Sequence, residues 1–309
     1  MSTSLGVEQQ VLHAYVALEN LGAGRSINDL ADELGISRFT VSRMVKRARS
    51  DGLIDVRATI ESPVDVELSG RLAERFGLRS AFAVHTPGPD EALARNVIAR
   101  VTARYLEENA VDDDVLGLSP GRTLVAASRL VNRMPYLDVV QLTGVGTART
   151  EDGAESVTNL GRVAGGGTYP LYAPIISEVP AQAITSHPAV QQTIRRFDHL
   201  TKAVMTIGGW PESSLLAELV QQLGMLDELM GRGIVGEIGG VLLDADGREV
   251  PAPEGRMVGI TSDQIRRTPL AVGVGGGPSK TQAVLATLRS GLCHVVITDA
   301  DSARAALAA

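Results

Sequence analysis

The sequence predicts a chain of the α/β class in two parts: a small helical unit at the N-terminus and a larger domain with a mainly parallel sheet covered on both faces. Residues 1–57 contain few glycines and have helical patterns, whereas beyond about residue 80 short β-prone runs alternate with longer helical patterns. A chain of 309 residues is long enough for about two domains. Ser62-Pro63 marks a linker, so we expect domains at 1–60 and 61–309.

The N-terminal unit begins with a helix and continues with a helix-turn-helix pattern. The first helix is predicted from apolar residues at helical spacing: Val7, Val11, Leu12, Tyr15, Leu18 and Leu21. Ser26 can cap a second helix, Gly35 permits the tight turn that ends it, and Ser37 can cap a third. Small Ala31 lets two helices cross closely, as in a helix-turn-helix.

The third helix carries a one-sided polar and basic face that suits the major groove of DNA. The residues expected to contact DNA are Ser37, Arg38, Thr40, Ser42, Arg43 and Lys46, with Arg57 on a wing strand predicted at Leu53–Ile60. The alternative is a small helical bundle whose basic face is merely solvated.

Charge separates the two parts of the chain. The formal net charge of −7 argues at first against a nucleic-acid partner. Residues 37–57, however, hold six basic and two acidic residues, which gives this window +4 and leaves −11 for the remainder. Such asymmetry predicts two different kinds of partner.

The larger domain is predicted from apolar runs and the helical patterns between them. The expected strands are Ala81–Val84, Val115–Leu118, Val139–Leu142, Val204–Ile207, Val241–Leu243, Leu270–Val274 and Val295–Ile297. The expected helices are Asp65–Phe76, Glu91–Glu108, Thr123–Met134, Ser213–Met230 and Ser279–Arg289. This alternation predicts a three-layer βαβ arrangement.

Four of the predicted strands run into glycine-containing loops. Ligands of open α/β sheets bind beyond the carboxyl ends of the strands, so these loops point to one crevice. Glycines let the backbone approach a ligand, and hydroxyl and cationic side chains beside a helix start suit a phosphate. The candidate ligand-binding residues are Ser119, Gly121, Arg122, Thr123, Gly144, Gly208, Glu237, Asp244, Gly275, Gly276 and Lys280. Glycines that serve only as turns are the alternative.

Other site types fit the sequence poorly. The first loop lacks the Gly-Lys-Ser/Thr ending of a Walker loop and the spacing of a dinucleotide fingerprint. Ser119 stands in a Gly-x-Ser-x-Gly string, but an Asp and a His do not follow in hydrolase order. The histidines lack metal-ligand spacing, and the single cysteine, Cys293, is expected in the core. We expect no metal and no cofactor.

With these motifs in this order, nearly the whole chain resembles the SorC family of bacterial transcriptional regulators, also called DeoR-like. The segments that carry the resemblance start at Gly35, Gly117, Gly236, Asp244 and Gly275, and it extends to the closing Val296-Ile-Thr-Asp-Ala-Asp-Ser-Ala. It implies a winged helix-turn-helix joined to an isomerase-like, Rossmann-type domain, and tetramers built from dimers. It also implies that a sugar or sugar phosphate controls operator binding.

By position, the resemblance places the phosphate at Ser119, Gly121, Arg122 and Thr123, with Lys280 assisting and Glu237 at the sugar hydroxyls. The chain departs from the family at Pro120, where an aromatic is frequent, and near Ile238, where a cysteine is frequent. These departures concern the identity of the ligand. The alternative function is a sugar-phosphate isomerase or deaminase-type enzyme. The acidic catalytic segment of such enzymes is missing after the second glycine loop, so we expect no enzyme activity.

The expected protein is thus a cytoplasmic regulator, a repressor or an activator. Its expected partners are double-stranded operator DNA, a small sugar-like effector and further copies of itself as dimer or tetramer. No signal peptide or membrane-spanning run is visible in the sequence, and a single cysteine suits a reducing compartment.

Overall fold

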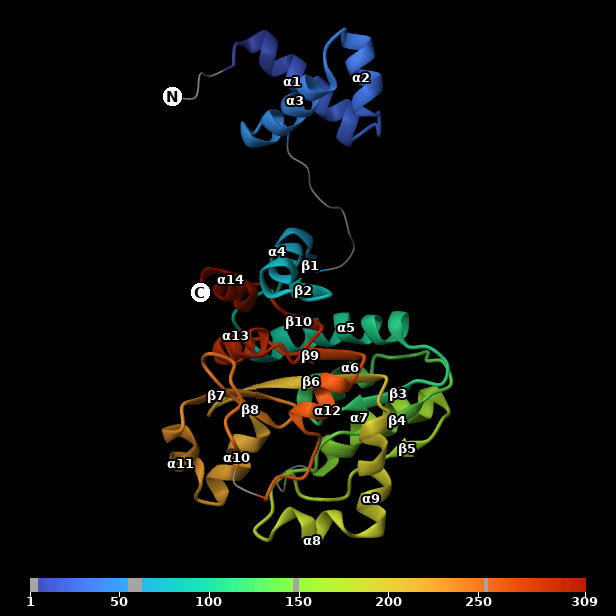
Figure 1. Cartoon of the computed structure of the whole chain (residues 1–309), viewed down its shortest axis with the longest axis vertical. Helices are drawn as coiled ribbons and strands as arrows, with labels where there is room; N and C mark the ends of the chain where they lie inside the picture. The colour runs from blue at the N-terminus through green and yellow to red at the C-terminus, as the bar shows by residue number, and fades with distance from the viewer. Residues whose placement is uncertain (1–4, 55–62, 147–149, 253–254) are drawn as a thin grey trace. The chain divides into compact units, whose positions relative to one another are not determined.

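The computed structural model describes residues 5–54, 63–146, 150–252 and 255–309. By contacts the chain divides into two compact units, Met1–Ile60 and Glu61–Ala309. Figure 1 labels the helices and strands of both units.

The small unit contains three helices, α1 (Val7–Leu21), α2 (Ile27–Leu34) and α3 (Arg38–Ser50). The predicted caps are present: Ser26 Oγ accepts the Asp29 N–H, Ser37 Oγ accepts the Thr40 N–H, and Gly35 ends α2 at φ 65°. The left-handed backbone conformation at this position has little energetic cost in glycine, so the chain can turn sharply between α2 and α3. The core of the unit consists of Val16, Ala17, Leu30, Ala31, Val41, Val45 and Ala48.

The small unit differs from the predictions at α1 and after α3. The residues that predicted α1 do not face its core: Val7, Val11 and Leu18 are exposed, and the helix packs through Val16 and Ala17. Of the predicted wing strand, Leu53 and Ile54 are not in strand conformation. The remainder of it, including Arg57, lies outside the described residues.

The large unit is a three-layer α/β domain around one sheet. The strands of the main path are β1 (Val64–Asp65), β2 (Ser80–Val84), β10 (Val295–Asp299), β9 (Leu270–Val274), β6 (Lys202–Gly209), β3 (Val115–Leu118), β4 (Asp138–Gln141) and β5 (Thr168–Tyr169), in this spatial order. All neighbours on this path are parallel except β1 and β2. An antiparallel hairpin of β7 (Ile234–Ile238) and β8 (Val241–Asp244) extends from the end of β6.

Helices cover both faces of this sheet (Figure 1). One face packs against α4 (Val66–Phe76), α13 (Thr281–Ser290) and α14 (Ala300–Ala308), and the other against α5 (Glu91–Asn109), α6 (Arg122–Ser128) and α7 (Thr150–Ala164). Successive residues of β6 therefore alternate between two cores: Met205 and Ile207 belong to one, Val204 to the other. Burial on both faces explains the continuous apolar runs in the sequence.

The remaining elements lie at the edges of the domain. They are α8 (Ala181–Thr185), α9 (Pro188–Ile194), the 3₁₀ helix η1 (Arg195–His199), α10 (Leu215–Gln222), α11 (Leu226–Gly231), α12 (Ser262–Arg267) and the 3₁₀ turn η2 (Pro278–Lys280). The helix predicted at Ser213–Met230 is thus two helices, separated at Gly224, which has φ +69°. The helix predicted to reach Met134 ends at Ser128.

Candidate functional site

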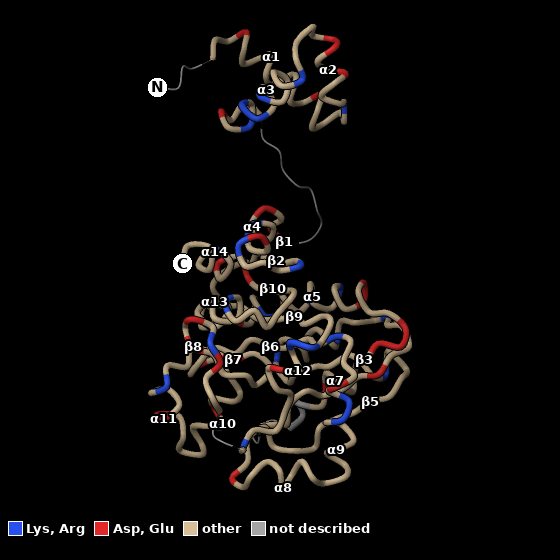
Figure 2. The backbone as a smooth tube through the Cα atoms, in the orientation of Figure 1, with Lys and Arg blue, Asp and Glu red and all other residues tan. Residues whose placement is uncertain are grey.

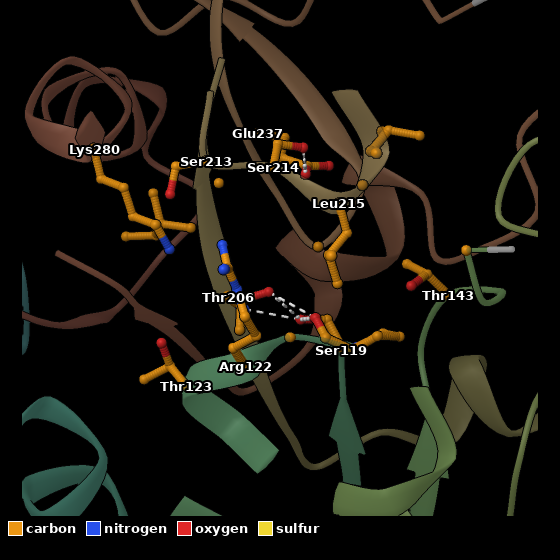
Figure 3. A pocket seen from close by; sticks show the side chains of 18 of the residues that line it. Ser119, Arg122, Thr123, Thr143, Thr206, Ser213, Ser214, Leu215, Glu237 and Lys280 are labelled. Carbon is orange, nitrogen blue, oxygen red and sulfur yellow. Dashed lines mark hydrogen bonds between the residues drawn. The ribbon is translucent and has the colours of Figure 1, made fainter. Parts of the chain in front are cut away.

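A pocket lies beyond the carboxyl ends of the central strands of the large unit (Figure 3). From β3 the chain proceeds by α6 to β4 on one side, whereas β6 lies on the other side of β3 and leads on to β9. Such a reversal of strand order opens a crevice between the two loops that follow the strands. Residues 119–123 after β3 and 206–208 at the end of β6 both line this pocket. The space between its walls is about 810 Å³, open solvent at the mouth included.

Ser119 joins the two loops. Its hydroxyl accepts the Thr206 N–H at 2.8 Å and lies 3.1 Å from Thr206 Oγ1, which itself donates to the Pro120 carbonyl at 2.8 Å (Figure 3). Gly121 has φ +153°, and a Cβ there would overlap the Thr206 side chain. The loop after β3 is therefore held closely against β6, and only glycine fits at its turn.

Three cations line the pocket: Arg95 from α5, Arg122 at the start of α6 and Lys280 where η2 meets α13. Figure 3 shows the Lys280 ammonium and the Arg122 guanidinium extending toward the same part of the cavity. Among the residues that the structure describes, none forms an ion pair or a side-chain hydrogen bond with these three groups. Burial lowers the pKa of Lys280 to about 8, although Glu91 and Glu237 nearby oppose the shift. The neighbouring Arg122 and Arg95 lower it further.

Two carboxylates complete the charged set, and both have partners. Glu91 accepts hydrogen bonds from the N–H and the hydroxyl of Ser279, at 2.9 and 2.6 Å. Glu237 accepts one from the Ser214 hydroxyl. Burial raises the pKa of Glu237 to about 7, and both the Ser214 hydrogen bond and Lys280 act against that shift. A side chain at Gly208 would collide with Glu237, so glycine there leaves room for this carboxylate.

The pocket is therefore electropositive within an acidic chain. Three cations line it against two carboxylates, and the raised pKa of Glu237, about 7, disfavours the charged form of one of these two. Unpaired cations in a partly dry site are stabilised by a charged oxygen ligand, and phosphate offers several such oxygens. The hydroxyls of Thr143, Ser213 and buried Thr123 add neutral hydrogen-bonding groups.

The second candidate site is the exposed side of α3. Figure 2 shows basic residues along this helix. Of the predicted DNA contacts, Ser37, Arg38, Arg43 and Lys46 are exposed, and Thr40 and Ser42 are partly exposed. Val41, Val45 and Ala48 on the opposite side are buried. The helix thus presents one polar and basic face to solvent, as a recognition helix does.

Within the described ranges, no three His, Cys, Asp or Glu side chains are grouped so as to hold a metal ion. Cys293 is buried, and this burial raises the pKa of its thiol to about 12. None of the described helices combines the length and apolarity that a membrane span requires.

Comparison with known proteins identifies the family. Residues 63–308 match a family model described as "Putative sugar-binding domain", and residues 22–55 match a winged helix-turn-helix DNA-binding model. The chain belongs to the SorC family of sugar-binding regulators, also called DeoR-like.

Relatives and solved structures agree with this assignment. The chain is 26% identical to the Deoxyribonucleoside regulator of Bacillus subtilis, over 96% of this chain and 97% of that protein. It is 26% identical to the Erythritol catabolism regulatory protein EryD of Brucella abortus, over 92% of each. The full-length Sorbitol Operon Regulator SorC from Klebsiella pneumoniae has the same fold, with a TM-score of 0.71 and 19% identity over 99% of this chain and all of that one. A SorC-type chain with both domains is a DNA-binding transcriptional regulator that responds to sugars.

In this SorC-family chain most of the predicted ligand-binding residues meet in one pocket. Those that line it are Ser119, Gly121, Arg122, Thr123, Gly144, Gly208, Glu237, Gly276 and Lys280. Asp244 does not line it: its carboxylate accepts the N–H groups of Asp246 and Arg248 and so shapes the turn after β8. Gly275 is buried between neighbouring strands, where its N–H donates to Ile297. Glu237 lies inside β7 and precedes the apolar strand β8.

Several residues of the pocket were not predicted from the sequence. Glu91 and Arg95 stand one turn apart at the start of α5, and this spacing was their only signal. Thr206 was hidden inside an apolar run, and Ser214 caps α10 by accepting the Ala217 N–H. Glu91, Arg95 and Thr206 do not follow a glycine-containing strand end, which was the pattern that marked the others, and Ser214 comes five residues after Gly209.

Proposed function

We propose that this regulator is controlled by a phosphorylated sugar or polyol bound in the pocket of the large unit. The observation that carries the proposal is the group of three cations, Arg95, Arg122 and Lys280, that have no partner among the described residues of a chain with net charge −7. A phosphate dianion between Arg122 and Lys280 supplies the missing partner. Glu237 and the Ser213 hydroxyl then face the sugar hydroxyls.

The proposed mechanism is a population shift. The exposed face of α3 contacts the bases and phosphates of a half-site in operator DNA in the cytoplasm. The large units assemble the chain into a dimer or tetramer. A ligand that favours one arrangement of the subunits changes how well two recognition helices fit two half-sites. Such a regulator needs no turnover, so we expect the effector to be released unchanged.

A thermal-shift screen tests the proposal. Inorganic phosphate, free sugars, polyols and their phosphates are compared, with deoxyribose and erythritol phosphates included because of the names of the two relatives. A phosphorylated compound should raise the melting temperature in proportion to the logarithm of its concentration, because it binds only the folded state. The parent compound without phosphate should do so much less. Equal shifts by both would contradict a phosphate site.

The same screen detects the enzymatic alternative. Any compound that stabilises the protein is incubated with it and followed by NMR. Conversion of the compound would overturn the expectation of a regulator without catalysis.

A further inference from the structure

Helix α1 presents an apolar stripe that its own unit does not cover. The side chains of Val7, Val11, Leu18 and Leu21 are 76%, 64%, 59% and 45% exposed. The same helix buries Val16 and Ala17 completely against α2 and α3, so it is firmly part of the fold. Single exposed apolar residues need no explanation, but an aligned set of them indicates an interaction surface.

The spacing of the stripe is that of a coiled-coil seam. Val7, Val11, Ala14, Leu18 and Leu21 follow one another at intervals of four, three, four and three residues. This repeat of 3.5 residues keeps one line of side chains facing a parallel or antiparallel helix of the same kind. Ala14 at the centre is small, which allows two such helices to approach closely.

The absence of charge on the stripe and at the flanking positions of its seam is compatible with pairing to a second copy of the same helix. The stripe itself holds no charged residue, and the seam-flanking positions Gln10 and Tyr15, which would meet in a parallel pair, are uncharged. Two identical helices therefore meet without like charges across the seam. We propose that α1 pairs with α1 of a second copy of this chain, so that two small units form one DNA-reading pair.

The rest of the small unit is compatible with this pairing. Because α1 packs on α3 through Val16 and Ala17, its stripe faces away from that contact and need not cover the basic face of α3. Two heptads are too short to hold two free helices together in water. The pairing therefore depends on the large units to raise the local concentration of the small ones. It stands whether or not the effector is a sugar phosphate.

Cysteine cross-linking of the full chain tests the pairing. The only native cysteine, Cys293, is buried, so a new surface thiol is the reactive one. Val11→Cys, Ala14→Cys and Leu18→Cys place a thiol on the seam one at a time. Gln9→Cys places it on an exposed position of the same helix away from the seam, as a matched control. Under mild oxidation at low protein concentration, the chains joined by a disulfide are measured by non-reducing electrophoresis.

A disulfide forms only where two Cα atoms lie within about 7 Å of each other. In a parallel pair of α1 helices, Val11→Cys and Leu18→Cys should therefore cross-link. In an antiparallel pair centred on Ala14, Ala14→Cys should cross-link instead. At least one seam position should react about tenfold faster than Gln9→Cys. Equal rates at all positions would overturn the proposal. So would seam thiols that neither cross-link nor react with an alkylating reagent, since the stripe would then be covered by other parts of its own chain.

Discussion

Lys280 is the residue on which the proposed phosphate site depends most. Its pKa is lowered to about 8 and it has no ion-pair partner among the described side chains, so its ammonium gains most from a bound anion. A hydrogen bond to a charged group contributes about 1.5–3 kcal/mol. Lys280→Ala should therefore weaken binding of the phosphorylated effector about 10- to 100-fold, measured by titration calorimetry.

The control for this change is Arg248→Ala. Arg248 is a surface cation outside the pocket, and its guanidinium pairs only with Asp246 among the described carboxylates. This variant should bind the effector as the unchanged protein does. An equal loss in both variants would show that general charge, not the Lys280 position, attracts the ligand.

Glu237 and Lys280 together predict how effector binding depends on pH. Glu237 gains its negative charge around pH 7, and Lys280 loses its positive charge around pH 8. The phosphate is already a dianion in this range, because its second pKa is about 6. Both changes make the pocket less attractive to it, so affinity should fall steadily between about pH 6.5 and 8.5. Glu237→Gln should remove the lower part of this fall, whereas a profile unchanged by the substitution would contradict the role of Glu237.

The same carboxyl predicts an effect on stability in the absence of ligand. The pKa of Glu237 rises from 4.5 to about 7 on folding, so between these values the folded state holds more protons than the unfolded state. The free energy of unfolding then decreases as pH rises through this window, by about 3 kcal/mol for a shift of this size. Glu237→Gln, which can still accept the Ser214 hydrogen bond, removes this loss. The melting temperature of Glu237→Gln should exceed that of the unchanged protein by more at pH 8 than at pH 5. A difference between the two proteins that is the same at both pH values would contradict a buried, titrating carboxyl at Glu237.

At the scale of elements, the exposed face of α3 predicts a separation of functions. Arg43→Ala removes a cation from that face, so operator affinity measured by gel shift should fall. If Arg43 reads a base, the loss of binding free energy should be about 1–3 kcal/mol. Effector binding in the other unit should not change. Arg49→Ala, a substitution on the same helix outside the predicted contacts, is the matched control. Loss of effector-induced stabilisation in Arg43→Ala would mean that the substitution disturbs folding instead.

The elements that the sequence predicted well are those whose signal is local. Ser26 and Gly35 determine where α2 begins and ends, and Ser37 determines where α3 begins, through their own hydrogen bonds and backbone angles. The parallel strands were visible because burial on both faces demands apolar runs, and the glycine loops after them predicted most of the pocket.

The elements that were missed depend on distant contacts. Strand β7 contains Gly236, which breaks a β-pattern, and glycine is present there because a side chain would strike Ala283 of α13. Arg95 reaches the pocket only because the sheet order brings α5 beside the loops of β3 and β9. Asp244 has a carboxylate that could contact a ligand, but this carboxylate instead accepts hydrogen bonds from two backbone N–H groups of its own turn. Such outcomes follow from tertiary packing, which no short window of sequence contains.

At the scale of the whole molecule, charge is divided by function. The window of +4 lies at α3 and the positions that follow it, and the remainder carries −11. Yet the pocket within that acidic remainder is lined by three cations. The long-range field therefore contributes little to capture of an anionic effector, which depends on the local groups. The basic face of α3, by contrast, is expected to contact DNA, which is a polyanion, so DNA binding should weaken steeply with salt.

Since one chain holds both sites, the effect of each ligand on the other must be reciprocal. If the effector changes operator affinity by some factor, operator DNA must change effector affinity by the same factor, about 5- to 150-fold for a coupling of 1–3 kcal/mol. Titrating DNA at zero and saturating effector, and effector at zero and saturating DNA, gives both factors on the same protein. They should agree for the full chain. For residues 63–309 alone, effector affinity should be the same with and without DNA, because α3 is missing. If both factors were one in the full chain, the two sites would not be coupled, and the proposed population shift would be wrong.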